Sequence, residues 1–226
     1  MIGAAWAGPH VIHLATDSND QGGLAPGGRA VLRRAFERLG WQVQFEPLPL
    51  RRSLPMSVQG QLDGEALRIS AVAEKHRELL LVPGSISVVE VWAYVGDSGL
   101  KPNDWDKLVP LRVGYPRGVV LLEKMLAAVP RKHEATTSTD ALRLLRKDVV
   151  DVALLTLAAG QPGLSPDQLA GLHRLEKPLN TTHLYLLLHQ RHAGLIPALS
   201  EVLRAMEASG ESARLRARAW AQLAIP

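Results

Sequence analysis

The sequence contains no cysteine, and only 4% of its 226 residues are aromatic. Without cysteine, disulfide bonds, thiolate metal ligands and a cysteine nucleophile are excluded. The scarcity of aromatic residues argues against a surface that stacks nucleic-acid bases, so we expect no nucleic-acid partner. No apolar run approaches the roughly 20 residues that a membrane-spanning helix needs.

The composition is that of an ordinary globular protein, with 46% hydrophobic and 21% charged residues. A chain of this length accommodates one large domain or two lobes of about 100 residues each. The net charge is +4, and the lysines and arginines are spread along the chain rather than gathered in one block. This mild positive balance suits a small anionic ligand.

The first residues have one feature of an export signal. Ala5, Trp6 and Ala7 have the small-x-small form that signal peptidase reads. We interpret residues 1–7 as a signal-peptide remnant, with the mature protein beginning near Gly8 and working in the periplasm. A short N-terminal segment without this role is an equal alternative, because the Ala-x-Ala pattern is common in alanine-rich sequences.

The first half of the chain alternates between predicted strands and helices. Strands are expected at residues 10–17, 41–45 and 65–70, and Pro47 and Pro49 are expected to end the second of them. Between the strands we expect a flexible glycine- and proline-rich connection at residues 21–28, a helix within residues 27–40 that is capped by Gly40, and a short helix at residues 51–60. This order predicts a mainly parallel sheet with helices on its faces.

The second half repeats this pattern. Residues 110–118, 132–137 and 150–156 are predicted strands, and residues 119–129 and 138–148 are predicted helices. The segment 53–69 matches the segment 141–157 in kind, which suggests two similar lobes. Extended apolar segments at 86–95 and 182–189 are expected to cross between the lobes, and the helical tail from residue 196 is expected to return to the first lobe.

In this order, the elements resemble the type II periplasmic solute-binding proteins, in particular the amino-acid receptors of ABC transporters. The resemblance covers the chain from about residue 10 and rests on the order and spacing of GRAVLRRAFERLGWQVQFEPLPLRRSL, GQLDGEALRI, LRVGYPRGVVLLEKML, DALRLLRKDVVDVALL and HLYLLLHQ. It implies an α/β fold of two lobes, of the Venus-flytrap type, with two crossover strands as a hinge and the ligand in an interlobe cleft. Lobe 1 is then residues 8–91 and 184–226, and lobe 2 is residues 92–183. One continuous sheet without a cleft is the alternative.

Arg68 is the leading candidate ligand contact of lobe 1. It interrupts an apolar strand, and a buried arginine is costly unless its charge reaches solvent, a carboxylate or a ligand. Ligands gather at the carboxyl ends of parallel strands in such lobes, so Arg68 is placed to clamp a carboxylate or phosphate. A structural ion pair of Arg68 with Glu65 or Asp63 is an equal alternative.

Three further residues of lobe 1 are candidate ligand contacts. Glu65 belongs to the same strand as Arg68, and Asp17 closes the first strand, where it meets a ligand ammonium group or caps the following loop. Arg52 begins a helix that faces the cleft in the resembling proteins, although an exposed surface arginine is the simpler interpretation. The resembling proteins carry a carboxylate-clamping arginine in a Thr-x-Glu-Arg pattern, and this chain has Ala-Glu-Lys-His-Arg at residues 73–77.

In lobe 2 the candidate contacts follow the strand at residues 110–118. The resemblance implies that the backbone amides of Gly118 and Val119 hold a ligand carboxylate, without the hydroxyl donor of Gly-Thr or Gly-Ser. Tyr115 and Arg117 offer a stacking wall and a charge, or else form a solvated turn. Trp92 lies on the first crossover segment, where its side chain either forms the floor of the ligand pocket or packs within the hinge.

No catalytic or metal-binding pattern is present, so we expect a protein without catalytic residues, metal or cofactor. The leading function is a periplasmic solute-binding protein, a monomer that captures a small polar solute, anionic or zwitterionic, for an ABC permease or a membrane sensor. The alternatives are an interaction or sensor module that has lost solute binding, and an enzyme that acts on a small carboxylate on the same scaffold.

Overall fold

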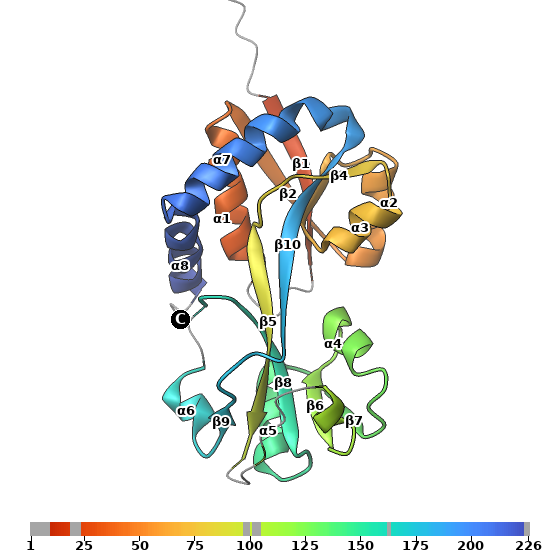
Figure 1. Cartoon of the computed structure of the whole chain (residues 1–226), viewed down its shortest axis with the longest axis vertical. Helices are drawn as coiled ribbons and strands as arrows, with labels where there is room; N and C mark the ends of the chain where they lie inside the picture. Colours follow the sequence, from red (N-terminus) through yellow and green to blue (C-terminus); the bar gives the residue numbers. More distant parts are fainter. Residues whose placement is uncertain (1–9, 19–23, 97–99, 101–104, 162–163, 224–226) are drawn as a thin grey trace, which may run out of the picture. The chain divides into compact units, whose positions relative to one another are not determined.

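A computed structural model describes residues 10–18, 24–96, 100, 105–161 and 164–223 of the chain (Figure 1). The predicted signal-peptide remnant at residues 1–7 lies outside the described residues. Contacts divide the chain into two compact units, unit 1 with Met1–Val88 and His183–Pro226 and unit 2 with Val89–Thr182. The chain leaves unit 1 within strand β5 (Ser87–Val95) and re-enters it within strand β10 (Asn180–His189).

Unit 1 contains a mixed sheet whose strands follow the order β2-β1-β3-β10. Its strands are β1 (His10–Asp17), β2 (Trp41–Leu48), β3 (Gly64–Arg68) and β4 (Leu79–Leu81) together with β10. Strand β1 is parallel to β2 and β3, as the β-α-β-α-β pattern predicts. Strand β10 is antiparallel to β3 and β4, because the chain returns from unit 2 in the opposite direction.

Two groups of helices surround this sheet. Helices α1 (Leu24–Glu37), α7 (Ile196–Ala208) and α8 (Glu211–Leu223) pack together, so the C-terminal tail returns to the first unit as expected (Figure 1). Helix α2 (Leu50–Val58) contacts β1 and β3, and the short helix α3 (Ser70–Lys75) contacts β4. The short 3₁₀ helix η2 (Gln190–Leu195) leads from β10 into α7. The core lies between α1, α7 and the strands, and includes Ile12, Leu14, Leu32, Phe36, Leu186 and Leu203.

Unit 2 has its own mixed sheet, in the order β5-β8-β6-β7. Its further strands are β6 (Val113–Pro116), β7 (Lys132–Ala135), β8 (Val152–Ala158) and β9 (His173–Arg174). Its helical segments are η1 (Asp106–Leu108), α4 (Val120–Met125), α5 (Ser138–Arg146) and α6 (Pro166–Leu169). Strand β6 is parallel to β7 and β8, and β5 is antiparallel to β8 and β9.

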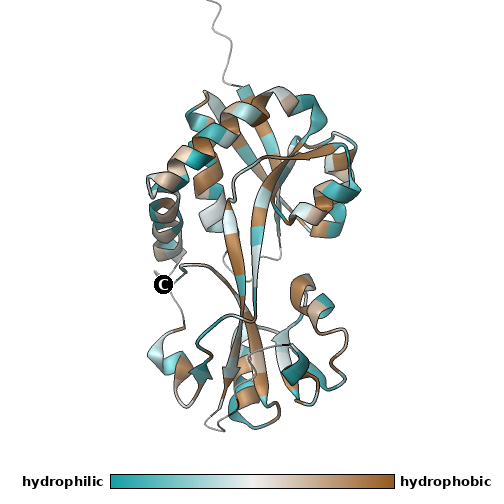
Figure 2. Ribbon diagram, viewed as in Figure 1, coloured by the Kyte–Doolittle hydropathy of each residue, from teal (hydrophilic) through white to brown (hydrophobic). Residues whose placement is uncertain are grey.

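Hydrophobic residues dominate the central strands of unit 2 and alternate with polar residues along α7 and α8 of unit 1 (Figure 2). Most residues of strands β5 and β8 are buried, which explains their largely apolar sequences. Within the described residues, no helix combines the length and the hydrophobicity needed to cross a membrane.

Several predicted boundaries are wrong. The strand predicted at residues 110–118 spans only Val113–Pro116, and the strand predicted at residues 65–70 ends at Arg68. Strand β2 continues through Pro47 to Leu48, because β2 ends the sheet order and proline is tolerated on an edge strand. Helix α4 stops at Met125, where the prediction extended it to residue 129. Helix α1 already starts at Leu24, although the predicted connection extended to residue 28. Gly27 and Gly28 are buried residues of this helix, and a Cβ atom there would lie 3.3 Å from the Trp220 side chain and 2.8 Å from the Leu67 side chain, respectively.

Candidate functional site

The candidate site of unit 1 lies where β1 and β3 end. The two strands are parallel, with Leu14 opposite Gly64, so their carboxyl ends meet at one edge of the sheet. Asp17 is the last residue of β1 and is partly exposed. The preceding hydroxyl, Thr16 Oγ1, is buried and has no hydrogen-bond partner within the described part of the chain. This is unusual, because most buried side-chain polar atoms in folded proteins have a hydrogen-bond partner.

Arg68 forms a buried ion pair with Glu65. The two residues are 9% and 1% exposed, and Arg68 Nη2 lies 2.8 Å from Glu65 Oε2 while Arg68 Nε donates to the same oxygen at 2.9 Å. Of the two ion pairs that the sequence allows for Arg68, with Glu65 or with Asp63, the structure contains the first. The clamp role of Arg68 toward a ligand stays a prediction.

Helix α2 completes this buried network. Ser53 and Ser57 donate to the two oxygens of Glu65, at 3.2 and 2.9 Å, and Arg68 Nη2 donates to Ser53 Oγ at 3.1 Å and to the Leu50 carbonyl at 3.2 Å. The sequence reasoning missed both serines. Their spacing of four residues, which places two hydroxyls on one face of a helix, is the signal that could have found them. Among the described residues, no group bonds to Arg68 Nη1.

Arg52 lies on the exposed face of α2, one residue before the buried Ser53. No side-chain hydrogen bond or ion pair joins Arg52 to another described residue. Its charge is therefore available at the surface of unit 1, next to the end of the Arg68 network.

Asp63 belongs to another part of unit 1, at the beginning of β3. It accepts a hydrogen bond from the backbone amide of His13 at 2.7 Å, lies 2.6 Å from His192 Nε2, and pairs with Arg191. Burial favours a higher pKa for Asp63, but these hydrogen bonds and the charge of Arg191 outweigh it, so its pKa is below the ordinary value of 3.8. Asp63 thus anchors η2 to the sheet.

In unit 2, Tyr115 is a core residue of β6. It is 2% exposed, and its hydroxyl donates to Glu134 Oε1 at 3.0 Å. Burial raises the pKa of Tyr115 to about 12, with further contributions from the hydrogen bond to Glu134 and from nearby negative charge. The hydroxyl therefore stays protonated and engaged with Glu134.

The turn after β6 has its own internal acceptor. Gly118 has φ +79°, and its backbone amide donates to Glu123 Oε1 at 3.0 Å. Val119 directly precedes α4 and packs against the core of unit 2, and Arg117 is exposed. The amide that was predicted to hold a ligand carboxylate is thus bonded to a carboxylate of the chain itself.

Trp92, the last candidate, is 9% exposed and lies on β5. Its indole Nε1 donates to Glu90 at 3.0 Å, and the guanidinium carbon of Arg174 lies 4.1 Å from a ring centroid of the indole. This stacking is a cation–π contact within unit 2. Within the described residues there is no group of three or more His, Asp or Glu side chains able to hold a metal ion.

The chain is similar in structure to solute-binding proteins and to a sensor domain. It superposes on the sensor domain of a histidine kinase with similarity to periplasmic binding proteins, with a TM-score of 0.65, 17% identity, and 92% of this chain and 95% of that chain covered. It also superposes on an ancestral cationic amino-acid solute-binding protein (TM-score 0.63, 14% identity, 91% and 93% covered).

A third similar structure is the amino-acid ABC transporter substrate-binding protein of Streptococcus pneumoniae bound to L-arginine (TM-score 0.62, 13% identity, 93% and 94% covered). An uncharacterised protein of Shewanella oneidensis is 23% identical over 201 residues, which are 84% of this chain and 75% of that protein. No protein-family model matches the chain. The type II periplasmic-binding-protein fold that the resemblance implied is therefore confirmed.

Proposed function

We propose that the chain is an extracytoplasmic solute-binding protein that captures a small polar solute with residues at the ends of its strands. The observation that carries this proposal is the fold, which more than nine tenths of the chain shares with solute-binding proteins of amino-acid transporters and with a kinase sensor domain. The proposed partner is an ABC permease or a membrane sensor, and the proposed working form is a monomeric receptor in the periplasm.

An anionic or zwitterionic solute fits the charges at these strand ends. Arg68 keeps Nη1 without a partner among the described residues, and the exposed Arg52 lies on the neighbouring helix α2. In unit 2, Arg117, which directly follows β6, is likewise exposed. A carboxylate accepts hydrogen bonds from guanidinium groups in a bidentate manner, and Asp17 offers a counter-charge for an ammonium group.

A thermal-shift screen against amino acids, organic acids and polyamines tests this proposal, because a ligand that binds only the native state raises the melting temperature. We expect at least one carboxylate to raise it. The Arg52→Gln variant should reduce the shift, whereas Arg51→Gln, an equally exposed neighbour on α2, should not. The proposal fails if no compound in the screen shifts the melting temperature, and turnover of a compound would indicate an enzyme instead.

A sensor or interaction module without a solute is the second candidate. It is favoured by the internal pairing of both predicted clamps, Arg68 with Glu65 and the Gly118 amide with Glu123. In such a module the two carboxylates take the place of the solute. If this is the function, the Glu123→Gln variant should bind carboxylates that the unmodified chain ignores.

A further inference from the structure

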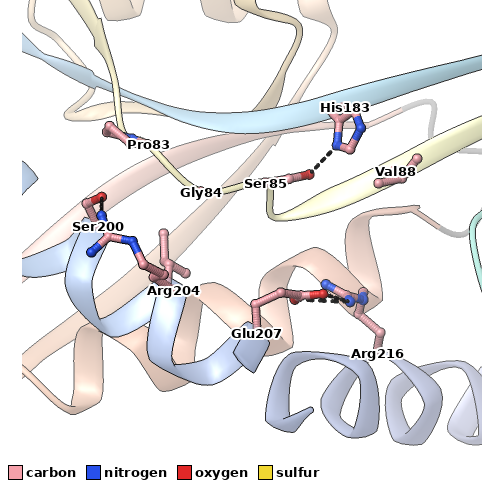
Figure 3. Close-up of a pocket in the computed structure, with 10 residues that line it drawn as sticks. Pro83, Gly84, Ser85, Val88, His183, Ser200, Arg204, Glu207 and Arg216 are labelled. Atoms are coloured by element: carbon pink, nitrogen blue, oxygen red, sulfur yellow. Dashed lines mark hydrogen bonds and ion pairs between the residues drawn. The ribbon is translucent and has the colours of Figure 1, made fainter. Parts of the chain in front are cut away.

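Unit 1 contains a cavity apart from the strand-end residues discussed above. Its volume is about 340 Å³, within the range of roughly 300–1,000 Å³ typical of small-molecule sites. It lies between the connection from β4 to β5, strand β10, and helices α7 and α8 (Figure 3). We call it the junction pocket, defined by its polar lining residues Ser85, His183, Ser200, Arg204, Glu207 and Arg216.

Two guanidinium groups line the junction pocket, and among the described residues only Arg216 has a carboxylate partner, Glu207. Arg216, with 15% of its side chain exposed, donates to the Ile86 carbonyl at 3.1 Å, and its Nη2 is 3.4 and 3.5 Å from the two oxygens of Glu207. Arg204 donates only to Ser200 Oγ, at 3.5 Å, and has no ion pair with any described residue (Figure 3). These distances are at the long end for hydrogen bonds, so both cations have donor capacity left.

A hydroxyl and an imidazole add to this lining. Ser85 Oγ donates to the Ser87 carbonyl at 2.9 Å, and His183 Nδ1 lies 3.2 Å from Ser85 Oγ. Because the serine proton is used toward Ser87, His183 Nδ1 is the donor in this contact. The charged groups of the lining are therefore the two guanidinium groups and the single carboxylate of Glu207.

The remaining lining is apolar, with Pro83, Val88 and Leu203. Gly84 lies in the connection from β4 to β5 and has φ +119°, and a Cβ atom there would lie 3.2 Å from Leu203 Cβ. The ligand that matches this lining has one carboxylate for the two guanidinium groups and a small apolar body for the other walls.

The position of the junction pocket suggests what such a ligand would influence. Val88 is the last residue of unit 1 before the chain enters unit 2, and His183 is the first after it returns. Both line the pocket, and all of its lining residues belong to unit 1. A ligand bound there contacts both crossing segments at their unit 1 ends.

We propose that the junction pocket is a second binding site, for a small organic monocarboxylate. It is separate from the proposed solute site, since it shares no residue with it, and a ligand in it restrains the two segments through which the chain passes between its units. Restraint of such segments couples the pocket to any motion that uses them as a hinge.

Calorimetric titration of the whole chain with benzoate, at constant ionic strength, tests this site. We expect benzoate to bind, and the Arg204→Gln variant to bind about tenfold more weakly, since one charge-assisted hydrogen bond is lost. Glu207→Gln should bind benzoate more tightly, because it removes the carboxylate that competes for Arg216. The control Arg218→Gln, an exposed arginine of α8 outside the pocket, should leave the affinity unchanged.

Several results would overturn the proposal. The first two are the absence of any heat of binding with benzoate, and an equal loss of benzoate affinity in Arg204→Gln and Arg218→Gln. The others are a lower benzoate affinity in Glu207→Gln, and binding of inorganic phosphate in place of benzoate. Loss of benzoate binding in Arg52→Gln with Arg204→Gln unaffected would assign the benzoate to the proposed solute site. Failure of the thermal-shift screen to find a solute, with benzoate binding that follows the expected pattern, would leave the junction pocket supported.

Discussion

The charge of Arg68 is neutralised inside unit 1 by a carboxylate of its own strand. Arg68 bonds to Glu65 and Ser53, and Ser57 bonds in turn to Glu65, so Arg68 contributes to the folded structure whether or not a solute binds. A buried pair of this kind is weak evidence for net stabilisation, because the desolvation of both ions offsets their attraction. Removal of one partner is different, since it leaves an uncompensated charge in the core.

The Arg68→Met variant should therefore lower the free energy of unfolding by about 3–5 kcal/mol. The double variant Glu65→Gln/Arg68→Met should be less destabilised than the single one, because the buried charge is gone from both positions. Urea denaturation monitored by circular dichroism measures both. A single variant as stable as the unmodified chain would show that the pair has no structural role.

The low pKa of Asp63 implies that the stability of unit 1 depends on pH in the acid range. Because its pKa is lower in the folded than in the unfolded chain, its stabilising effect is present above the unfolded value, near 3.8, and is lost as the pH falls through the folded value. We expect the free energy of unfolding to fall below about pH 4, and Asp63→Asn to flatten this part of the profile. Asp167→Asn, an exposed residue of α6, is the control and should leave the profile unchanged. An unaltered acid profile in Asp63→Asn would contradict this assignment.

At the scale of elements, the contact between β3 and β10 depends on Gly64. A Cβ atom at this position would lie 2.1 Å from the Leu187 carbonyl oxygen on β10, closer than any real contact. Gly64→Ala should separate the two strands and cost about 3 kcal/mol or more, the upper part of the range for overpacking. Gly194→Ala is the matched control, since a Cβ atom there meets nothing within 4 Å. Equal stability of the two variants in urea would show that β3 and β10 shift apart without cost.

Most elements could be predicted because their signals are local. The alternation in β1 and the periodicity of α1 and α5 follow from which side chains face the core. The start of α1 at Leu24 was not predicted, because residues 21–28 are rich in glycine and proline, and only the folded chain shows Trp220 and Leu67 packed against Gly27 and Gly28. Pro47 was predicted to end its strand, because the sequence does not show that β2 lies at the edge of the sheet, where proline is tolerated.

At the scale of the molecule, the hydrophobic clusters follow the division into units. One cluster, with Phe36 and Leu203, belongs to unit 1, and two others, one with Leu122 and Leu154 and one with Leu142, belong to unit 2. A substitution in one cluster should therefore loosen mainly the unit that contains it.

Leu142→Ala tests this separation, since it opens a cavity under α5 and should cost about 2–5 kcal/mol. We expect hydrogen exchange followed by mass spectrometry to accelerate in α5, β6 and β8, and to stay slow in α1 and β1. Phe36→Ala should give the reverse pattern. Equal acceleration in both units in either variant would mean that they unfold as one cooperative body.

The sequence by itself determined the order of the longer strands and helices, the parallel pairing of β1 with β2 and β3, and the similarity of the two halves, because these depend on local periodicity and on connections along the chain. The short elements α3, β4, α6 and β9 were not predicted. The sequence left three possible partners for Arg68, namely a ligand, Glu65 and Asp63, and did not decide between them. Only the tertiary structure decided that Glu65 pairs with Arg68 and accepts hydrogen bonds from Ser53 and Ser57. It also decided that Glu123 accepts the hydrogen bond of the Gly118 amide. The physical reason is that a buried charge or an unpaired amide bonds to whichever complementary group the folded chain brings within hydrogen-bond distance, and the local sequence pattern shows only which groups are candidates.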